Sequence, residues 1–112
     1  MEEYSIHNVD FGMGEGHEQS RQRPAIVFKV INELNMCIVI PLTSNMNHLN
    51  MPYTVQINKT GHTNLREDSV ALVFQIRAID KMRMTGNQIG KVEEYQVNKI
   101  KSSLREMLSL NI

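Results

Sequence analysis

The chain has 112 residues, 41% of them hydrophobic, which is enough for one small domain with a modest core. Lys and Arg residues number 12, as do Asp and Glu residues, and this zero net charge argues against a bulk electrostatic nucleic-acid binder but not against a local basic groove. The single cysteine, Cys37, excludes an internal disulfide, and its apolar neighbours predict a buried, unreactive thiol.

The sequence shows no sign of a membrane segment. No apolar run approaches the length that spans a bilayer, and the first eight residues, MEEYSIHN, lack the charge pattern and apolar core of a signal peptide. We therefore expect a cytoplasmic protein without a membrane partner.

Short apolar and β-branched segments predict strands over most of the chain. The expected strands are residues 4–11, 24–31, 36–42, 53–57 and 69–76, with residues 77–84 continuing extended. Pro24 is expected to begin its strand, because no ladder donor is needed there. Residues 32–35, NELN, predict a turn, residues 58–68 predict a loop, and residues 85–90, TGNQIG, predict a break.

The last segment has a different period. Apolar residues recur at helical spacing on one face, at Val92, Tyr95, Val97, Ile100, Leu104, Met107 and Leu108. The opposite face carries charges of both signs, which favours a helix lying on a sheet over a membrane-surface helix. Together the segments predict one mainly β (α+β) domain over residues 1–112, a small β-barrel of five to seven strands with a C-terminal α-helix packed on it.

Two patterns that suggest cofactor sites are weak here. The four histidines, His7, His17, His48 and His62, show no metal-ligand spacing, and no second cysteine is present, so we expect no metal site. The glycines at 12–16, GMGEG, lack the lysine and the helix that a phosphate loop needs, and they predict a connecting loop instead.

Residues 16–27, GHEQSRQRPAIV, crowd polar side chains before an apolar strand. Cleaving a phosphodiester without a metal needs a base for the attacking hydroxyl, an acid for the leaving oxygen, and cations around the phosphorane. Glu18 or His17 could be the base, and Arg21 and Arg23 could supply the positive charge. The alternative is a solvated loop that caps a strand.

A second polar pair follows a buried strand. Thr43 and Ser44, in the sequence IPLTSN, stand where side chains are held rigidly and still reach solvent. A simple turn is the alternative, because these residue types also favour turns.

These segments, in this order, resemble the MazF/PemK family of toxins from bacterial toxin–antitoxin systems. The resemblance is carried by DFGMGEGHEQSRQRPAIVF at 10–28, IVIPLTS at 38–44 and DSVALVFQIRAID at 68–80, followed by the C-terminal helix. It implies an SH3-like barrel that acts as a homodimer and binds a cognate antitoxin. It also implies a metal-independent, cofactor-free endoribonuclease that cuts single-stranded RNA such as mRNA at short sequences. The 2′-hydroxyl would attack, leaving a 2′,3′-cyclic phosphate and a 5′-hydroxyl.

The resemblance also assigns roles to individual residues. The family's catalytic arginine and threonine fall on Arg23 and Thr43, and its proposed base falls on Glu18, with His17 as a rival. Arg23 has an ordinary pKa too high for easy proton donation, so we interpret it as a stabiliser of the phosphorane's charge. The expected RNA-binding residues are Gln19, Arg21, Ser44, Gln75 and Arg77.

Two other functions fit the same resemblance. A related toxin family of this fold inhibits DNA gyrase through a C-terminal tryptophan, but this chain has no tryptophan and ends SLNI. A degenerate homologue that only binds RNA or antitoxin is the other alternative, because residues 20–22, SRQ, replace a spacer that usually contains glycine, and Tyr4 and Ser5 replace a frequent Gly-Asp pair.

Overall fold

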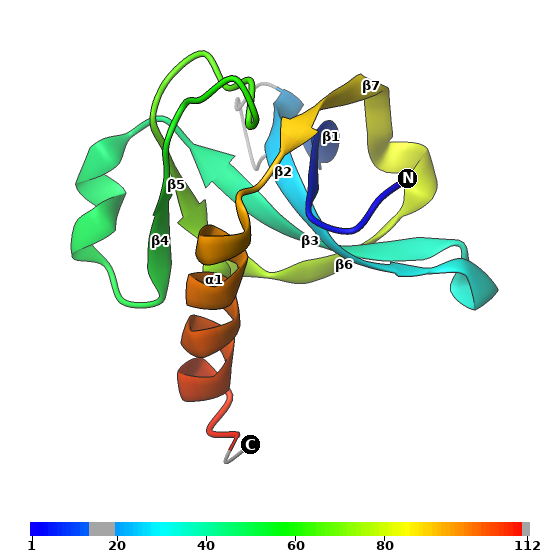
Figure 1. The fold of residues 1–112 in the computed structure, drawn as a ribbon. Helices are drawn as coiled ribbons and strands as arrows, with labels where there is room; N and C mark the ends of the chain where they lie inside the picture. The colour runs from blue at the N-terminus through cyan, green and yellow to red at the C-terminus, as the bar shows by residue number, and fades with distance from the viewer. Residues whose placement is uncertain (14–19, 111–112) are drawn as a thin grey trace.

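The computed structural model describes residues 1–13 and 20–110; the side chains of Met13, Ser20 and Arg21 lie outside that description. The strands are β1 Ser5–Met13, β2 Ser20–Ile31, β3 Met36–Thr43, β4 Thr54–Ile57, β5 Ser69–Leu72, β6 Arg77–Asp80 and β7 Met84–Lys91. The one α-helix of the described residues is α1, Glu94–Met107, and short 3-10 helices are η1 Asn32–Leu34, η2 Met46–Asn50, η3 Val73–Gln75 and η4 Lys81–Arg83. The mainly β prediction with a C-terminal helix is confirmed (Figure 1).

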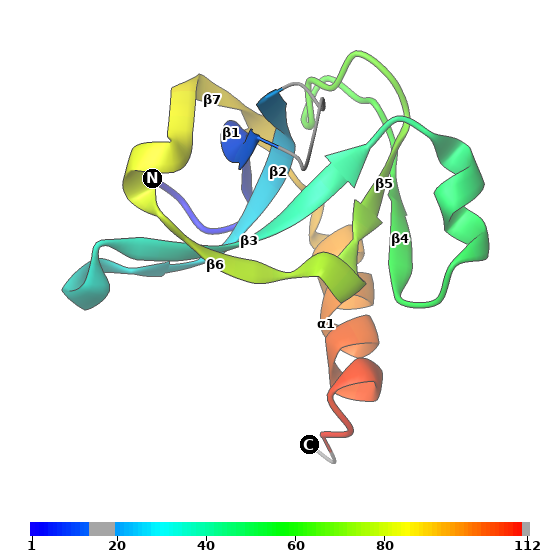
Figure 2. The same cartoon turned by 180° about the vertical axis from the view of Figure 1, so that it is seen from behind.

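All strand pairs are antiparallel, in the order β4-β5-β3-β2-β1-β7, with β6 beside β3. Strand β3 is the centre of this sheet. One of its edges pairs with β2, while its other edge pairs with β6 over residues 36–39 and with β5 at Leu42 and Thr43. Figure 2 shows β6 running beside β3 and then leading away from it. The sheet therefore curls around β3, and the last residues of β3 meet different neighbours from its first residues.

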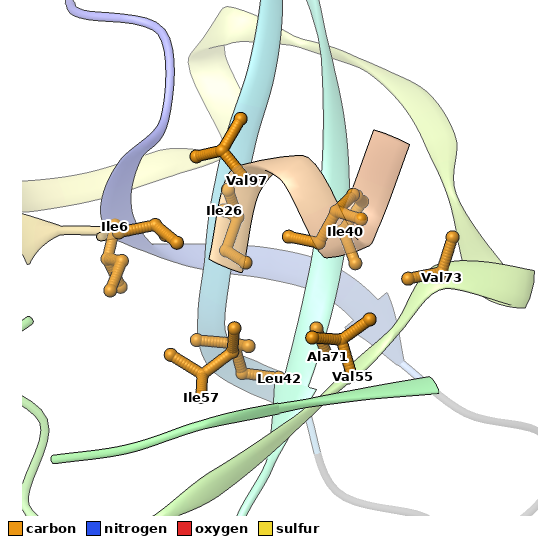
Figure 3. Packing of buried hydrophobic residues seen from close by; sticks show 11 residues of the cluster. Ile6, Ile26, Ile40, Leu42, Val55, Ile57, Ala71, Val73 and Val97 are labelled. Atoms are coloured by element: carbon orange, nitrogen blue, oxygen red, sulfur yellow. The ribbon is translucent and has the colours of Figure 1, made fainter. Parts of the chain in front are cut away.

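The central parts of β2 and β3 are apolar, and both of their faces are buried at residues 25–27 and 39–42. One face contributes Ile26, Ile40 and Leu42 to a cluster that α1 covers (Figure 3). The other face contributes residues such as Val27 and Val39 to a second cluster on the opposite side of the sheet. This double burial explains why both strands were visible in the sequence as continuous hydrophobic runs.

Only part of the apolar stripe predicted for α1 packs against the sheet. Val97 and Ile100 are buried and Leu104 packs against the same cluster, whereas Tyr95 and Leu108 are each more than half exposed. A glutamine, Gln96, is fully buried, and its Nε2 donates to the backbone oxygen of Gln56 on β4 at 3.4 Å. No helix in the described part of the chain is long and apolar enough to cross a membrane.

The strand predicted over residues 69–76 is wrong in its second half. Strand β5 ends at Leu72, and residues 73–75 form the 3-10 helix η3 before β6 begins at Arg77. The buried apolar run continues through Val73, so its hydrophobicity alone gave no sign of the turn. The turn lets the chain leave the Leu42–Thr43 end of β3 and pair with residues 36–39 of the same strand.

The predicted break at residues 85–90 is also wrong, because this segment lies inside β7. Its two glycines and Asn87 are residue types depleted in strands, but pairing with β1 supports the segment, with Asn8 opposite Thr85 and Ile6 opposite Gly90. The register shifts between these two pairs, and Gly86 has a φ of 71°. The glycine residue thus permits an irregular strand that a regular period could not reveal.

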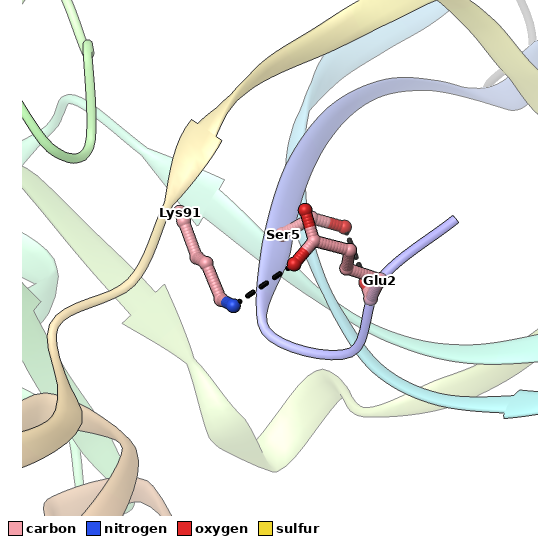
Figure 4. A network of polar contacts seen from close by, with 3 residues as sticks. All are labelled: Glu2, Ser5 and Lys91. Atoms are coloured by element: carbon pink, nitrogen blue, oxygen red, sulfur yellow. Dashed lines mark hydrogen bonds and ion pairs between the residues drawn. The ribbon is translucent and has the colours of Figure 1, made fainter.

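Strand β7 ends beside the start of the chain. Lys91 Nζ lies 3.0 Å from Glu2 Oε2, and the Ser5 hydroxyl donates to the Glu2 backbone oxygen (Figure 4). The hydrogen bond from Lys91 lowers the pKa of the Glu2 carboxyl below its ordinary 4.5. Because this pair is exposed, it orders the surface more than it adds to stability.

Candidate nucleic-acid cleavage site

Arg23 lies within strand β2, not in a loop. The prediction that Pro24 begins the strand is wrong, because β2 begins at Ser20. Residues 20–24 of β2 pair with β1 alone, so this stretch is locally an edge where a proline is tolerated. The proline also restricts the residue before it to extended conformations, which fixes the backbone of half-buried Arg23 opposite Val9 of β1.

Thr43 is the last residue of β3 and is half-buried. Its Oγ1 accepts a hydrogen bond from the backbone N–H of Asn45 at 3.2 Å, which orients the side chain at the start of the following turn. A hydroxyl has one hydrogen to donate besides its acceptor positions. No acceptor among the described residues takes the hydroxyl hydrogen of Thr43, so this hydrogen can be donated to a bound anion.

Arg23 and Thr43 each lie two residues beyond the last pair that joins β2 and β3, Ala25 with Pro41. There Arg23 pairs with Val9 of β1, and Thr43 pairs with Val70 of β5. Both side chains nevertheless line one cleft. A cation and a hydroxyl donor thus face one space from two rigid strands.

The cleft has a volume of about 940 Å³. Besides Arg23 and Thr43 it is lined by the exposed Ser44, by polar residues of β1 and β7, and by residues 64–67 of the loop between β4 and β5. Figure 1 shows this loop at the same end of the molecule as the end of β3 and the start of β2. The described lining holds two arginines, Arg23 and Arg66, and one carboxylate, Glu67.

A second cavity, of about 340 Å³, adjoins Arg23 on its other side and is lined also by Phe11, Pro41, Gln75 and Arg77. The Arg77 guanidinium lies over the Phe11 ring, with its central carbon 5.4 Å from the ring centroid. Two arginines and no acidic residue belong to its described lining. The predicted residues Gln75 and Arg77 thus lie beside Arg23, in a space suited to a polyanion with planar bases.

The other predicted residues of the polar stretch lie outside what the structure describes. His17, Glu18 and Gln19 fall in the gap at 14–19, as does most of the glycine-rich segment. Arg21 lies in β2 by its backbone, but its side chain is not described. The choice between Glu18 and His17 as base therefore stays a prediction.

Several residues of the larger cleft were missed in the sequence, among them Asn8, Gln22, Gln88, Asn64, Arg66 and Glu67. Residues 58–68 were interpreted only as a loop, and residues 85–90 as a break. The one available signal was that the loop carries both a cation and a carboxylate just before the strand that pairs with Thr43.

The remaining titratable groups that the structure describes form no second site. Among the described residues, no three His, Cys, Asp or Glu side chains gather where they could hold a metal ion. The predicted burial of Cys37 is confirmed, and burial raises the pKa of its thiol. His7 is buried in β1, where desolvation lowers its pKa below 6.5 and its Nε2 has no hydrogen-bond partner in the described structure.

Known proteins share both this sequence and this fold. Endoribonuclease EndoA of Bacillus subtilis (strain 168) is 29% identical over 108 residues, covering 94% of this chain and 91% of the relative. The crystal structure of MazF from Deinococcus radiodurans superposes with a TM-score of 0.76 at 21% identity, covering 98% of this chain and 97% of that one.

A mycobacterial endoribonuclease solved in complex with its cognate antitoxin has a TM-score of 0.72 at 18% identity, covering 98% of this chain and 96% of that one. At such identities the structures establish the fold. The family model of PemK-like, MazF-like toxins of type II toxin–antitoxin systems matches residues 2–108. The chain therefore belongs to this toxin family.

Proposed function

We propose that this toxin is an endoribonuclease that cuts single-stranded RNA, with mRNA as its target, at a short recognition sequence and without a metal ion. The observation that carries the proposal is that Arg23 of β2 and Thr43 of β3 line one open cleft. The name of the Bacillus subtilis relative, an endoribonuclease, supports the same reaction class.

Arg23 and Thr43 have complementary roles in this proposal. The guanidinium of Arg23 presents several N–H donors in one plane, which suits the non-bridging oxygens of a phosphate and the charge of the phosphorane. The Thr43 hydroxyl donates its free hydrogen to one of the same oxygens. Both donors come from strands, so they need little reorganisation when the charge develops.

The proposed reaction is an internal transfer on the RNA. Glu18 or His17 takes the proton of the 2′-hydroxyl, and the 2′-oxygen forms a bond to the adjacent phosphorus. The bond to the 5′-oxygen breaks, and that oxygen takes up a proton, for which water in the open cleft is a source. The products are a 2′,3′-cyclic phosphate and a 5′-hydroxyl.

The flanking nucleotides would contact the surfaces on either side of Arg23. On one side, Gln75 and Arg77 offer hydrogen-bond donors and positive charge beside the ring of Phe11. On the other side, Ser44 adds a hydroxyl at the cleft. Gln19 and Arg21 remain proposed RNA contacts from the segment that precedes Arg23.

We further propose three properties of the protein in the cell. Its partner is a cognate antitoxin, as in the mycobacterial complex, and it acts as a homodimer. It works in the cytoplasm, where mRNA is available. Light scattering with and without a candidate antitoxin would test both assemblies. A monomeric toxin at micromolar concentration would contradict the homodimer.

The reaction is tested with matched RNA substrates. The wild type should cut a single-stranded RNA in excess EDTA, and a 2′-deoxy substitution at the nucleotide before the cut should abolish cutting there alone. The 3′ product should accept phosphate from polynucleotide kinase without prior phosphatase treatment, since it begins with a 5′-hydroxyl. Cutting of the 2′-deoxy substrate, or a 5′-phosphate on the product, would overturn the proposed chemistry.

A further inference from the structure

The loop between β4 and β5, residues 58–68, is held in one conformation by its own hydrogen bonds. Thr63 is fully buried, its Oγ1 donates to the Asn58 backbone oxygen at 2.8 Å, and it accepts from the Thr60 N–H at 2.9 Å. Asp68 closes the loop by accepting from the Lys59 N–H at 2.8 Å. These hydrogen bonds define the conformation of the loop backbone.

The same loop is fixed onto β7. The Lys91 N–H donates to the His62 backbone oxygen at 3.0 Å, and Asn64 Nδ2 donates to the Ile89 backbone oxygen at 3.0 Å. Between these two bonds, Gly90 leaves room for the loop backbone: a Cβ atom there would collide with the Thr63 carbonyl group. The loop is therefore a fixed wall of the molecule.

This wall lines the same cleft as Arg23 and Thr43. Arg66 lines the cleft from the loop and is exposed, and among the described residues its guanidinium has no ion-pair or hydrogen-bond partner. The neighbouring Glu67 lines the cleft too, with no ion pair to Arg66. An arginine without a partner among the described residues, in the same cleft as a second arginine, is suited to a neighbouring phosphate of one RNA strand.

We propose that the loop at 58–68 forms the second wall of the RNA site, and that Arg66 binds a backbone phosphate adjacent to the one at Arg23. This inference rests on the proposed function, because it assigns the path of the same substrate. It gives Arg66 a role in holding the strand, whereas Arg23 and Thr43 act on the reacting phosphate. Such a contact is independent of base identity and contributes mainly to binding.

The test measures binding separately from cutting. A fluorescein-labelled, mixed-sequence single-stranded RNA with 2′-O-methyl groups throughout cannot react, since it has no 2′-hydroxyl. Its dissociation constant is measured by fluorescence anisotropy at several KCl concentrations. Arg66→Ala should raise the dissociation constant about three- to ten-fold. The slope of log affinity against log salt should fall by about 0.7, the value for one phosphate of a single strand.

Neighbouring positions supply the controls. Glu67→Gln removes a negative charge from the same wall, so it should leave binding unchanged or tighten it. Arg66→Lys should keep the salt slope of the wild type. Arg105→Ala, which removes an exposed arginine from the last turn of α1, should not alter binding, and thermal melting should show that every variant is folded.

The outcomes separate the two proposals. Wild-type affinity and slope in Arg66→Ala, or equal weakening in Glu67→Gln, would overturn the assignment of Arg66 even if the wild type cuts RNA. If Arg66→Ala weakens binding as expected while the wild type cuts no RNA, the phosphate contact stands and the proposed endoribonuclease function fails.

Discussion

Gly90 of β7 packs against the backbone carbonyl of Thr63 so closely that no methyl group fits between them. A Cβ atom there would also lie 2.8 Å from the His62 carbonyl oxygen. Both obstacles are backbone, in a loop fixed by the buried Thr63 side chain, so neither moves easily. One glycine thus sets how closely the β4–β5 loop approaches the sheet and where Arg66 stands.

Replacing this glycine should destabilise the protein. We expect Gly90→Ala to lower the free energy of unfolding by about 1–3 kcal/mol, as overpacking does. Urea denaturation followed by circular dichroism would measure it. Gly61→Ala is the matched control, because no atom of the described structure lies within 4 Å of a Cβ there, and it should change stability by less than about 0.5 kcal/mol. Equal effects of the two substitutions would contradict the packing at Gly90.

Truncating Ile100, in the core beneath α1, should strongly destabilise the protein. This side chain is fully buried against the cluster formed by β2, β3 and β4. We expect Ile100→Ala to cost about 2–5 kcal/mol of unfolding free energy, from lost burial and the cavity left behind. Asn98→Ala, at an exposed position of the same helix, should be close to neutral in the same urea titration. A cost below about 1 kcal/mol at Ile100 would show that the helix docks differently.

Acidification should weaken the fold through His7. Desolvation lowers the pKa of this imidazole below 6.5, and a protonated ring would bury a charge whose Nε2 lacks a partner. As the pH falls through 6.5, the unfolded chain takes up the proton before the folded protein does. The contribution of neutral His7 to stability is therefore complete above pH 6.5 and decreases between pH 6.5 and the pKa of His7 in the folded protein. The Glu2–Lys91 ion pair affects stability only at lower pH, below 4.5, where the Glu2 carboxyl becomes protonated.

The measurement is the free energy of unfolding between pH 7.5 and pH 5. His7→Gln should flatten its pH dependence in this range, whereas His62→Gln, which changes an exposed imidazole, should leave the wild-type dependence intact. If the free energy of unfolding depends on pH equally in His7→Gln and in the wild type, His7 is not the origin of that dependence.

Substitutions at Thr43 should change the rate of catalysis separately from RNA binding. Its oriented hydroxyl would donate to the phosphorane, so Thr43→Val should lower kcat by about 10²-fold, the lower end of the cost of losing one preorganised donor. Thr43→Ser keeps the donor and should retain most of the activity. Single-turnover cutting of a labelled RNA at saturating enzyme would measure both. An unchanged rate in Thr43→Val would remove Thr43 from the proposed reaction.

The sequence predicted the strands best where burial is symmetric. Residues 24–31 and 36–42 stand out because β2 and β3 are covered on both faces, which leaves no polar alternation to interpret. Residues 73–75 were mistaken for strand because Val73 is buried in the same core while the backbone turns. Residues 85–90 were missed because pairing with β1, and not their own propensity, makes them a strand.

The sequence predicted one wall of the candidate site, with Arg23 and Thr43, better than the other wall, with Arg66. Arg23 was predicted from a stretch of polar residues, Thr43 from its place at a strand end, and both from the resemblance; the fold brings both to one cleft. The position of Arg66 depends on the contact between its loop and Gly90, which lies 24 residues further along the chain. No local pattern encodes such a contact, so this wall became visible only in the folded structure.

The most direct test of the proposed function compares the wild type with Arg23→Ala on one long single-stranded RNA in excess EDTA, with every cleavage end mapped. The wild type should cut at a small set of related sequences. Arg23→Ala should lose at least about 10²-fold in rate while melting like the wild type, and Arg105→Ala should cut normally. Full activity in Arg23→Ala, or cutting that requires an added metal ion, would contradict a metal-independent site built on Arg23.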